Sequence, residues 1–343
     1  MKNVNQKIID AVIAKAEKLC PDSLALIGVY GSVATKDEYE KSDLDLLILI
    51  QDDNGWKLGT GFILENSGIG YDIYCTNWDG LRYDAECHHA KLSKLMDSEI
   101  VYVKEQEAYD ELCRLRERTE KFLKSEERFE RVKELMDKAK VSYANALLNE
   151  GLGQVRLDAF DGILNLMDAL MLYHGTYFKC GVKRAFEELG RLPIEEDFLN
   201  KIKQIAESKE ISEIRSLLKS ILAYVEIYVR REKQKEEPSD GIAGTYEEMY
   251  SNWRNKVEEA AVNGDVFSAF ANMCSFNYMC QDISNDVNIG KYSIMEEYNP
   301  DNLVDNVRNY DECLARYEEV YKAAGIAVKR FADVDAFVAD YLE

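Results

Sequence analysis

The sequence is poor in the residues that build thiolate–metal or disulfide frameworks. Its 343 residues include only three histidines, and its eight cysteines contain no Cys-x-x-Cys pair. A structural zinc site needs four Cys or His ligands at short, paired spacings, so the chain gives no sign of one. We therefore expect reduced and mostly buried thiols.

Proline and long apolar runs are scarce as well. The chain has four prolines and no low-complexity tract, which argues against disorder. No uncharged apolar stretch approaches the roughly 20 residues that cross a bilayer, and residues 1–20 lack the apolar core of a signal peptide. With 46% hydrophobic and 31% charged residues, the chain is expected to be a globular, cytoplasmic protein of two or three domains.

The chain has fewer basic than acidic residues. It contains 43 Lys and Arg and 64 Asp and Glu, which give a net charge of −21. Nucleic-acid binding needs a net basic face, and an anionic membrane surface attracts basic segments. We expect neither as a partner, and the oligomeric state stays open. More than half of the deficit lies in residues 238–343, which hold 20 acidic and 8 basic side chains.

The chain changes character near residue 104. Before it, an amphipathic helix ends ahead of Pro21, a short helix spans about 88–96, and β-type apolar runs occur at 24–30, 43–51, 69–75 and 99–103. Beyond it, apolar residues recur three and four apart, which predicts helices. The pattern predicts an α+β protein: a small mixed-sheet domain (1–104), a helical domain (105–237) and an acidic helical unit (238–343), with a boundary in the Pro- and Gly-containing segment 233–244.

The residues most indicative of chemistry lie at the ends of the first two predicted strands. Gly31 and Ser32 follow the first strand, and Asp43 and Asp45 open the second. Two residues apart on a strand, the carboxylates share a face and suit a pair of divalent cations about 3.5–4 Å apart. Gly31 lets the backbone approach a phosphate, to which Ser32 and the following N–H groups can donate. A solvated strand end explains a bare Asp-x-Asp pair equally well.

A third acid, Asp72, lies within the next β-type run, between Tyr71 and Ile73. If that run lies beside the second strand, Asp72 joins Asp43 and Asp45. Three carboxylates gathered in this way suit two divalent ions.

Residues 30–51, YGSVATKDEYEKSDLDLLILIQ, resemble the G-S-x10-D-x-D signature of the DNA polymerase β-like nucleotidyltransferase superfamily. The layout of the chain resembles the antibiotic (aminoglycoside-type) nucleotidyltransferases, in which a helical domain follows the catalytic one. The resemblance implies a metal-dependent enzyme that transfers AMP from ATP to a hydroxyl of a small, cationic, aminoglycoside-like acceptor. It also implies two Mg²⁺ ions, held by Asp43, Asp45 and Asp72.

The same resemblance assigns the triphosphate to Gly31 and Ser32, with Ser42 as the lead-in to the first acid. Many relatives place an Arg a few residues after Gly-Ser, whereas this chain has Thr35 and Lys36. A cationic contact there would rest on Lys36 or Lys41, which lack the bidentate fork of Arg.

Later in the chain, Lys179, Lys183 and Arg184 form a basic cluster. In the functional interpretation, these side chains belong to the second domain and contact the triphosphate when that domain closes over it. Lys183 is then a nucleotide contact. Solvation of a surface cluster explains it equally well.

An acidic stripe runs along the apolar helix predicted over 156–177. Its members are Asp158, Asp161, Asn165 and Asp168, at positions i, i+3, i+7 and i+10. Such a stripe faces a water-filled cleft, cationic partners or simply solvent. In the functional interpretation Asp161 is favoured, over Glu150 and Asp158, as the base that activates the acceptor hydroxyl.

Two alternative functions stay open. The acceptor is a protein side chain in toxin-neutralising relatives, which are usually much shorter. In the second alternative, the chain binds a nucleotide without catalysing a reaction, although all three acids are present here.

Overall fold

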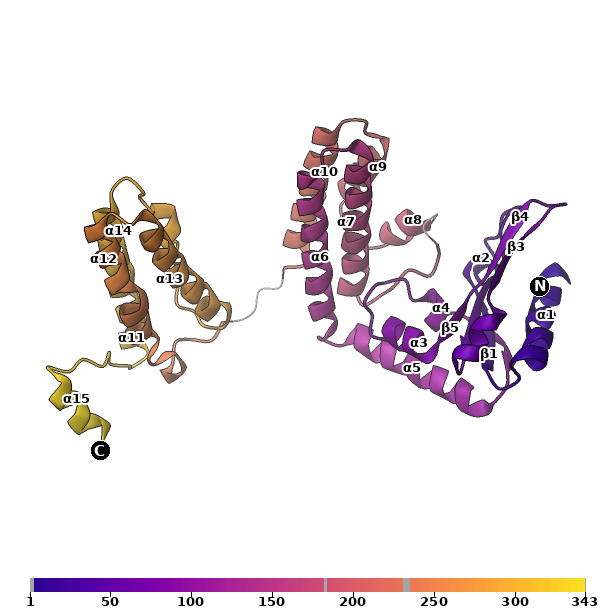
Figure 1. The fold of residues 1–343 in the computed structure, drawn as a ribbon, viewed down its shortest axis with the longest axis horizontal. Helices are drawn as coiled ribbons and strands as arrows, with labels where there is room; N and C mark the ends of the chain where they lie inside the picture. The colour runs from indigo at the N-terminus through magenta and orange to yellow at the C-terminus, as the bar shows by residue number, and fades with distance from the viewer. Residues whose placement is uncertain (1–2, 182–183, 231–234, 343) are drawn as a thin grey trace. The chain divides into compact units, whose positions relative to one another are not determined.

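The computed structural model describes residues 3–181, 184–230 and 235–342 of the chain. These residues form two compact units, 1–230 and 231–343, labelled in Figure 1. A small mixed sheet is followed by a mostly helical region. The predicted α+β class is therefore confirmed.

The sheet has four strands in the order β5-β2-β1-β6. Their bounds are β1 (Leu24–Tyr30), β2 (Asp45–Ile50), β5 (Cys75–Asn77) and β6 (Glu99–Val103). β1 is antiparallel to both β2 and β6, whereas β5 runs parallel to β2. The central strands β1 and β2 are buried on both faces, which explains their continuous apolar sequences.

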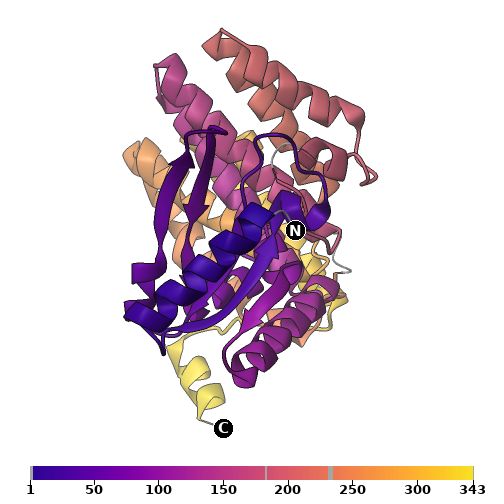
Figure 2. The ribbon, with the colours of Figure 1, turned by 90° about the vertical axis from the view of Figure 1, so that its right-hand side faces the viewer.

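Helices cover both faces of the sheet. They are α1 (Asn3–Leu19), α3 (Trp78–Ala85), α4 (Ser93–Met96) and α5 (Gln106–Lys124). On one face α1, on the near side in Figure 2, packs Ile9 and Val12 against Ile27 and Ile48. On the other face α3, α4 and α5 pack on the alternate strand residues. The alternation of strand side chains thus divides the core into two layers.

A separate hairpin of β3 (Thr60–Leu64) and β4 (Ile69–Ile73) flanks the sheet. A single turn of 3₁₀ helix, η1 (Asp53–Leu58), precedes it. Phe62 and Tyr71 stack across the hairpin with ring centroids 5.1 Å apart. The sequence predicted β4 but missed β3 and β5, because a five-residue strand without a fully buried residue and a three-residue strand leave little apolar periodicity.

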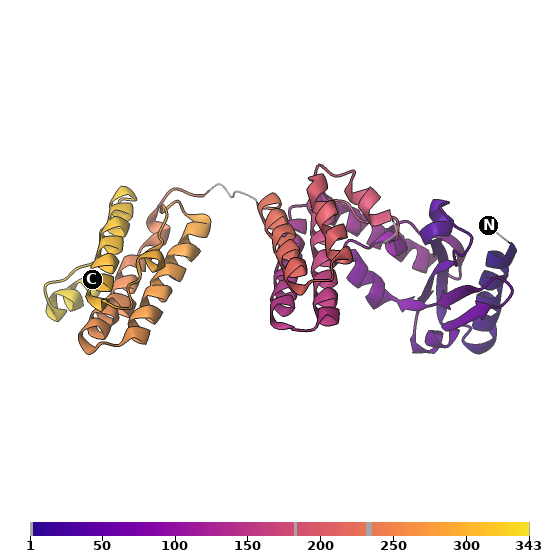
Figure 3. The same cartoon turned by 90° about the horizontal axis from the view of Figure 1, so that it is seen from above.

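The rest of the first unit is a helical bundle, seen from above in Figure 3. It comprises α6 (Arg128–Leu148), α7 (Leu152–Tyr173), α8 (Ala185–Leu189), α9 (Glu196–Glu207) and α10 (Ile211–Tyr228). Gly162 of α7 lies where a Cβ would be 3.5 Å from the Cβ of Ser142 on α6. Gly162 therefore lies at the contact between these two long helices.

The second unit is helical and has a tyrosine-rich core. It comprises η3 (Asp240–Ile242), α11 (Thr245–Met249), a π-helical turn (Tyr250–Arg254), α12 (Asn255–Asn263), α13 (Val266–Asp286), η5 (Ile294–Glu297), α14 (Leu303–Ala323) and α15 (Val334–Tyr341). The buried hydroxyls of Tyr310 and Tyr321 donate to backbone carbonyls, so these rings are buried without an unpaired polar group. Over the described residues, no helix has the length and apolar character to cross a membrane.

Candidate functional site

The turn after β1 is built around Gly31. Tyr30 is paired with Asp45 across the β1–β2 ladder, and Gly31 then takes a φ of 66° to begin α2 (Gly31–Thr35). A Cβ on Gly31 would lie 1.9 Å from Oδ2 of Asp45, so only glycine fits both the backbone angle and the space. The next backbone N–H, that of Ser32, donates to the Asp45 carboxylate.

The strand end carries concentrated negative charge. Burial, followed by the charge of Asp43, raises the pKa of Asp45. Burial and the charges of Asp45, Asp84 and Asp43 raise the pKa of Tyr30 to about 12. Two half-buried carboxylates that repel each other form an unfavourable arrangement unless a cation binds between them. The site therefore presents two adjacent carboxylates and a concentration of negative charge, an arrangement that a cation would stabilise.

Asp72 lies outside this pair, which differs from the predicted triad. In the parallel ladder Cys75 pairs with Ile48, and three residues earlier on each strand that register would align Asp72 with Asp45. The ladder stops at Cys75, however, and Asp72 pairs with Gly61 of β3 as an exposed residue. Among the described residues, no three His, Cys, Asp or Glu side chains are grouped to hold a metal ion.

A cavity of about 730 Å³ opens beside Asp45, within the first unit. Its sheet side includes Tyr30, Gly31, Ser32, Ser42, Asp43 and Asp45. Lys41 also lines it, although its Nζ donates to the carbonyl of Ser67 at 2.8 Å. Its opposite side includes Ile163, Met167, Asp168, Phe178, Phe186 and Ile205. The predicted phosphate-binding turn and the Asp-x-Asp pair thus face one cavity of a size typical for small-molecule sites.

Like Asp72, the predicted site residues Lys36 and Asp161 are not part of this cavity wall. Lys36 is exposed and ends α2 with a φ of 60°. Asp161 is exposed and accepts a hydrogen bond from Ser142 Oγ at 2.7 Å. Lys183 lies outside the described residues. The structure thus differs from the expectation for Asp161: residues before and after it on α7 line the cavity, whereas Asp161 itself is exposed and bonded to Ser142 of α6.

Asp168 is the acid that α7 places at the cavity. Its side chain is 4% exposed; the backbone N–H of Ala90 donates to the carboxylate, while Oδ1 has no hydrogen-bond partner among the described residues. Burial raises the pKa of Asp168 against the opposing effect of Lys91 and His89. The stripe in the sequence included Asp168, and its apolar neighbours were the signal that it, rather than Asp161, is buried.

Asp168→Asn is expected to stabilise the fold at neutral pH. The pKa of Asp168 in the folded chain lies above the ordinary value of 3.8. As the pH rises above 3.8, Asp168 therefore keeps its proton longer in the folded chain than in the unfolded chain. The free energy of unfolding falls over this pH range, because the unfolded chain ionises more easily. The neutral amide removes this loss. Thermal unfolding at about pH 7.5 should occur at a higher temperature than in the wild type, and the difference should vanish at about pH 3. A lower melting temperature at the higher pH would contradict the assignment; exposed Asp161→Asn is the control.

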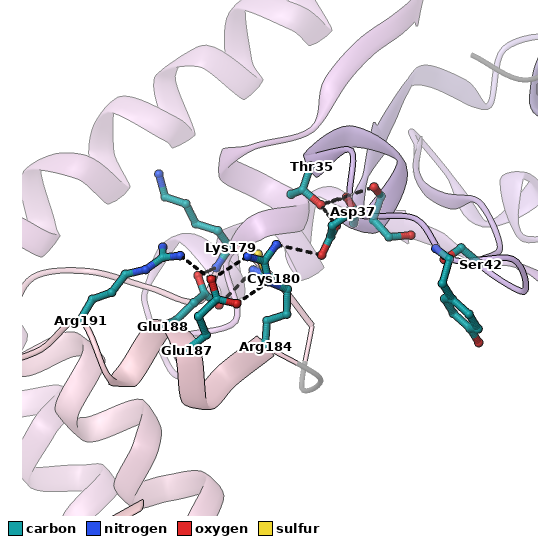
Figure 4. A network of polar contacts seen from close by, with 12 residues as sticks. Thr35, Asp37, Ser42, Lys179, Cys180, Arg184, Glu187, Glu188 and Arg191 are labelled. Atoms are coloured by element: carbon teal, nitrogen blue, oxygen red, sulfur yellow. Dashed lines mark hydrogen bonds and ion pairs between the residues drawn. The ribbon is translucent and has the colours of Figure 1, made fainter. Parts of the chain in front are cut away.

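An ion-pair network joins the loop after α2 to α8, as Figure 4 shows. Arg184 Nη1 lies 3.1 Å from Asp37 Oδ2, and its Nη2 lies 2.7 Å from Glu187 Oε1. The hydroxyl of Thr35 donates to the other oxygen of Asp37. These hydrogen bonds and the positive charge of Arg184 lower the pKa of Asp37. Asp37 and Arg184 both line the cavity, so the network connects its two sides.

The segment that precedes α8 is fixed by one buried acid. Glu188 accepts hydrogen bonds from the backbone N–H groups of Lys179 at 2.9 Å and Cys180 at 3.1 Å. Lys179 also lines the cavity. Of the basic cluster identified in the sequence, the structure therefore places Lys179 and Arg184 at the site.

Comparison with solved structures finds proteins of similar fold. The fold is similar to that of a nucleotidyltransferase-like protein from Exiguobacterium sibiricum 255-15, with 14% sequence identity and a TM-score of 0.32, over 71% of this chain and 80% of that one. No protein-family model and no curated protein matches the chain.

Proposed function

We propose that the protein is a metal-dependent nucleotidyltransferase of the DNA polymerase β-like superfamily, which transfers AMP from ATP to an acceptor hydroxyl. One observation carries the proposal: the Gly31–Ser32 turn packs directly on Asp45, beside Asp43, in the wall of a single cavity. A turn that exposes backbone N–H groups suits phosphate, and adjacent carboxylates suit the metal ion that accompanies a triphosphate.

Asp43 and Asp45 would hold Mg²⁺, which would neutralise charge on the triphosphate and polarise its reacting phosphorus. Burial and the charge of Asp43 raise the pKa of Asp45. This strain between the two acids supports the proposal that a cation binds to them. Asp72 is left outside the proposed ligand set, because it is exposed and is not part of the cavity wall.

Arg184 is proposed as the main cationic contact for the triphosphate. The chain has Thr35 and Lys36 where many relatives carry an Arg, and Lys36 is not part of the cavity wall, whereas Arg184 lines it. Nε and Nη2 of Arg184 bind Glu187, while Nη1 binds the carboxylate of Asp37, so Nη1 is the donor directed at an anion at the α2 loop. A triphosphate would compete with Asp37 for the same donors.

Arg184→Gln is expected to weaken binding of a non-hydrolysable ATP analogue about tenfold, because one charge-assisted contact is lost. Asp37→Asn is expected to strengthen binding, because it removes the competing carboxylate. Calorimetric titration in the presence of Mg²⁺ measures both.

Arg191→Gln is the matched control for Arg184→Gln. Arg191 also pairs with Glu187, at 3.0 Å, and its side chain is 66% exposed. Its loss should change the affinity by less than about twofold. Equal effects of the two Arg variants would show that Arg184 acts only through the network around Glu187.

The proposed reaction is tested directly with ATP labelled at the α-phosphate. If AMP is transferred, the labelled acceptor and free pyrophosphate should appear together, in equal amounts, when an accepted alcohol is present. Binding of ATP without label transfer across a broad panel of acceptors would favour a nucleotide-binding protein instead.

A further inference from the structure

The helical wall of the cavity is mainly apolar. It includes Ile163, Leu164 and Met167 of α7, Phe186 of α8 and Ile202 and Ile205 of α9. These side chains come from adjacent turns of α7 and from two further helices, so they form one surface rather than isolated contacts. A ligand that fills this part of the cavity must bury apolar area there.

Charge on this wall opposes a polycationic ligand. Arg156, Lys179 and Arg184 line the cavity from the helical bundle, whereas Asp168 is the carboxylate that the described part of the bundle contributes. An aminoglycoside-like acceptor with several ammonium groups would meet more positive than negative charge. The wall therefore disfavours the cationic acceptor that the sequence resemblance implies.

Asp168 gives the wall a buried hydrogen-bond acceptor. Oδ1 is buried without a partner among the described residues, while the other carboxylate oxygen is held by Ala90. An unpaired buried carboxylate oxygen is costly, and a hydrogen-bond donor on a ligand would satisfy it. The negative charge of Asp168 already interacts with three basic side chains, those of Lys91, His89 and Lys138. A ligand with a neutral hydroxyl is therefore favoured over one with an ammonium group, which these cations would repel.

We propose that the helical half of the cavity binds an acceptor that is an apolar alcohol, whose skeleton packs on α7, α8 and α9 and whose hydroxyl donates to Asp168. The inference rests on the proposed function for the role of this molecule as acceptor. Transfer then forms a bond from the hydroxyl oxygen to the α-phosphorus, breaks the bond to the pyrophosphate oxygen and releases the hydroxyl proton. Asp168, as an unpaired carboxylate next to the hydroxyl, is the group that can accept this proton.

The test uses two probes, 4-phenylbutan-1-ol and its methyl ether, in which a methyl group replaces the donor hydrogen. Ligand-observed NMR titration of the full chain, without nucleotide, measures both affinities. The wild type is expected to prefer the alcohol about tenfold, the effect of one hydrogen bond to a buried carboxylate. Asp168→Ala should reduce the preference to about one, and Asp161→Ala on the same helix should retain it. Equal affinities for alcohol and ether in the wild type, or binding of neither, would overturn the proposal.

A second variant tests the apolar surface without altering a buried charge. Ala206 is an exposed residue of α9 that lines the cavity, so Ala206→Phe should weaken both probes about fivefold or more by occupying space. Ala144→Phe, at an exposed position of α6 outside the cavity wall, should leave both unchanged. Equal effects of these two variants would contradict a site in the helical half.

A non-hydrolysable ATP analogue separates this inference from the proposed function. Simultaneous binding of analogue and alcohol supports an acceptor site, and displacement of the alcohol would overturn it by showing a nucleobase pocket. If the analogue fails to bind while the alcohol preference depends on Asp168, the ligand site is supported and the proposed nucleotidyl transfer fails.

Discussion

Asp45→Asn is expected to lower the affinity for Mn²⁺, in the presence of a non-hydrolysable ATP analogue, by about a hundredfold or more. Asp45 is half-buried, repelled by Asp43 and held by the N–H of Ser32, so it is the carboxylate most directly positioned for a cation. The amide keeps the hydrogen bond from Ser32 but loses the charge that binds the metal ion. Electron paramagnetic resonance of free Mn²⁺ measures the change.

The same substitution should make the folded chain more stable. Since the folded pKa of Asp45 is raised above the ordinary 3.8, its ionisation costs stability at every pH above that value, and Asn avoids the cost. Loss of metal affinity together with a higher melting temperature at neutral pH separates a ligand role from simple misfolding. A variant that binds Mn²⁺ as tightly as the wild type would contradict the assignment.

Asp72→Asn is the informative control for metal binding. In the structure Asp72 is exposed on β4 and unaligned with the acid pair, so the change should alter Mn²⁺ affinity by less than about twofold. A loss as large as that of Asp45→Asn would instead support the triad that the sequence predicted.

Gly31→Ala is expected to destabilise the first unit by about 2–3 kcal/mol and to abolish nucleotide binding. The φ of 66° at Gly31 is unfavourable for alanine, and the new methyl group would meet Asp45 Oδ2 at 1.9 Å. The carboxylate must then leave the position from which it binds a cation. Urea unfolding and calorimetric titration with the ATP analogue measure the two effects.

A double-mutant cycle divides the cost of Gly31→Ala between backbone and contact. In an Asp45→Ala background the carboxylate contact is absent, so the same change should cost only about 1–2 kcal/mol, the backbone term. Gly70→Ala is the control, because no atom lies within 4 Å of a Cβ there, and it should cost less than about 0.5 kcal/mol. An equal cost of Gly31→Ala in both backgrounds would rule out the contact with Asp45.

The sequence predicted the centre of the fold well because buried strands have a strong signature. The run 24–30 became β1 with the same bounds, and 43–51 became β2 (Asp45–Ile50), since residues 46–50 are apolar and buried. The predicted helix 88–96 is reduced to α4 (Ser93–Met96). There the buried residues Ala90 and Leu92 pack as a loop on the bundle, a tertiary contact without a periodic signal.

The composition of the candidate site was only partly predictable for a related reason. Gly31, Ser32, Asp43 and Asp45 are tied together by local register, which sequence spacing encodes. The position of Asp72 depends on which strand its own segment pairs with. That segment, β4, pairs with β3, and pairing with β2 begins only at Cys75. Sequence spacing does not predict this choice of partner.

The acid on α7 was misplaced because a helical stripe defines a face of the helix but not what surrounds each residue on it. Asp161 is exposed and accepts a hydrogen bond from Ser142 of α6, whereas Asp168 is buried, is held by the N–H of Ala90 and lines the cavity.

The most direct test of the central claim is a crystal structure of the full chain with Mn²⁺ and a non-hydrolysable ATP analogue. The account predicts an anomalous peak about 2.1–2.3 Å from carboxylate oxygens of Asp43 and Asp45, with the triphosphate against the Gly31–Ser32 turn. A nucleotide bound elsewhere, or a triphosphate in the cavity with no metal ion at these two acids, would contradict it.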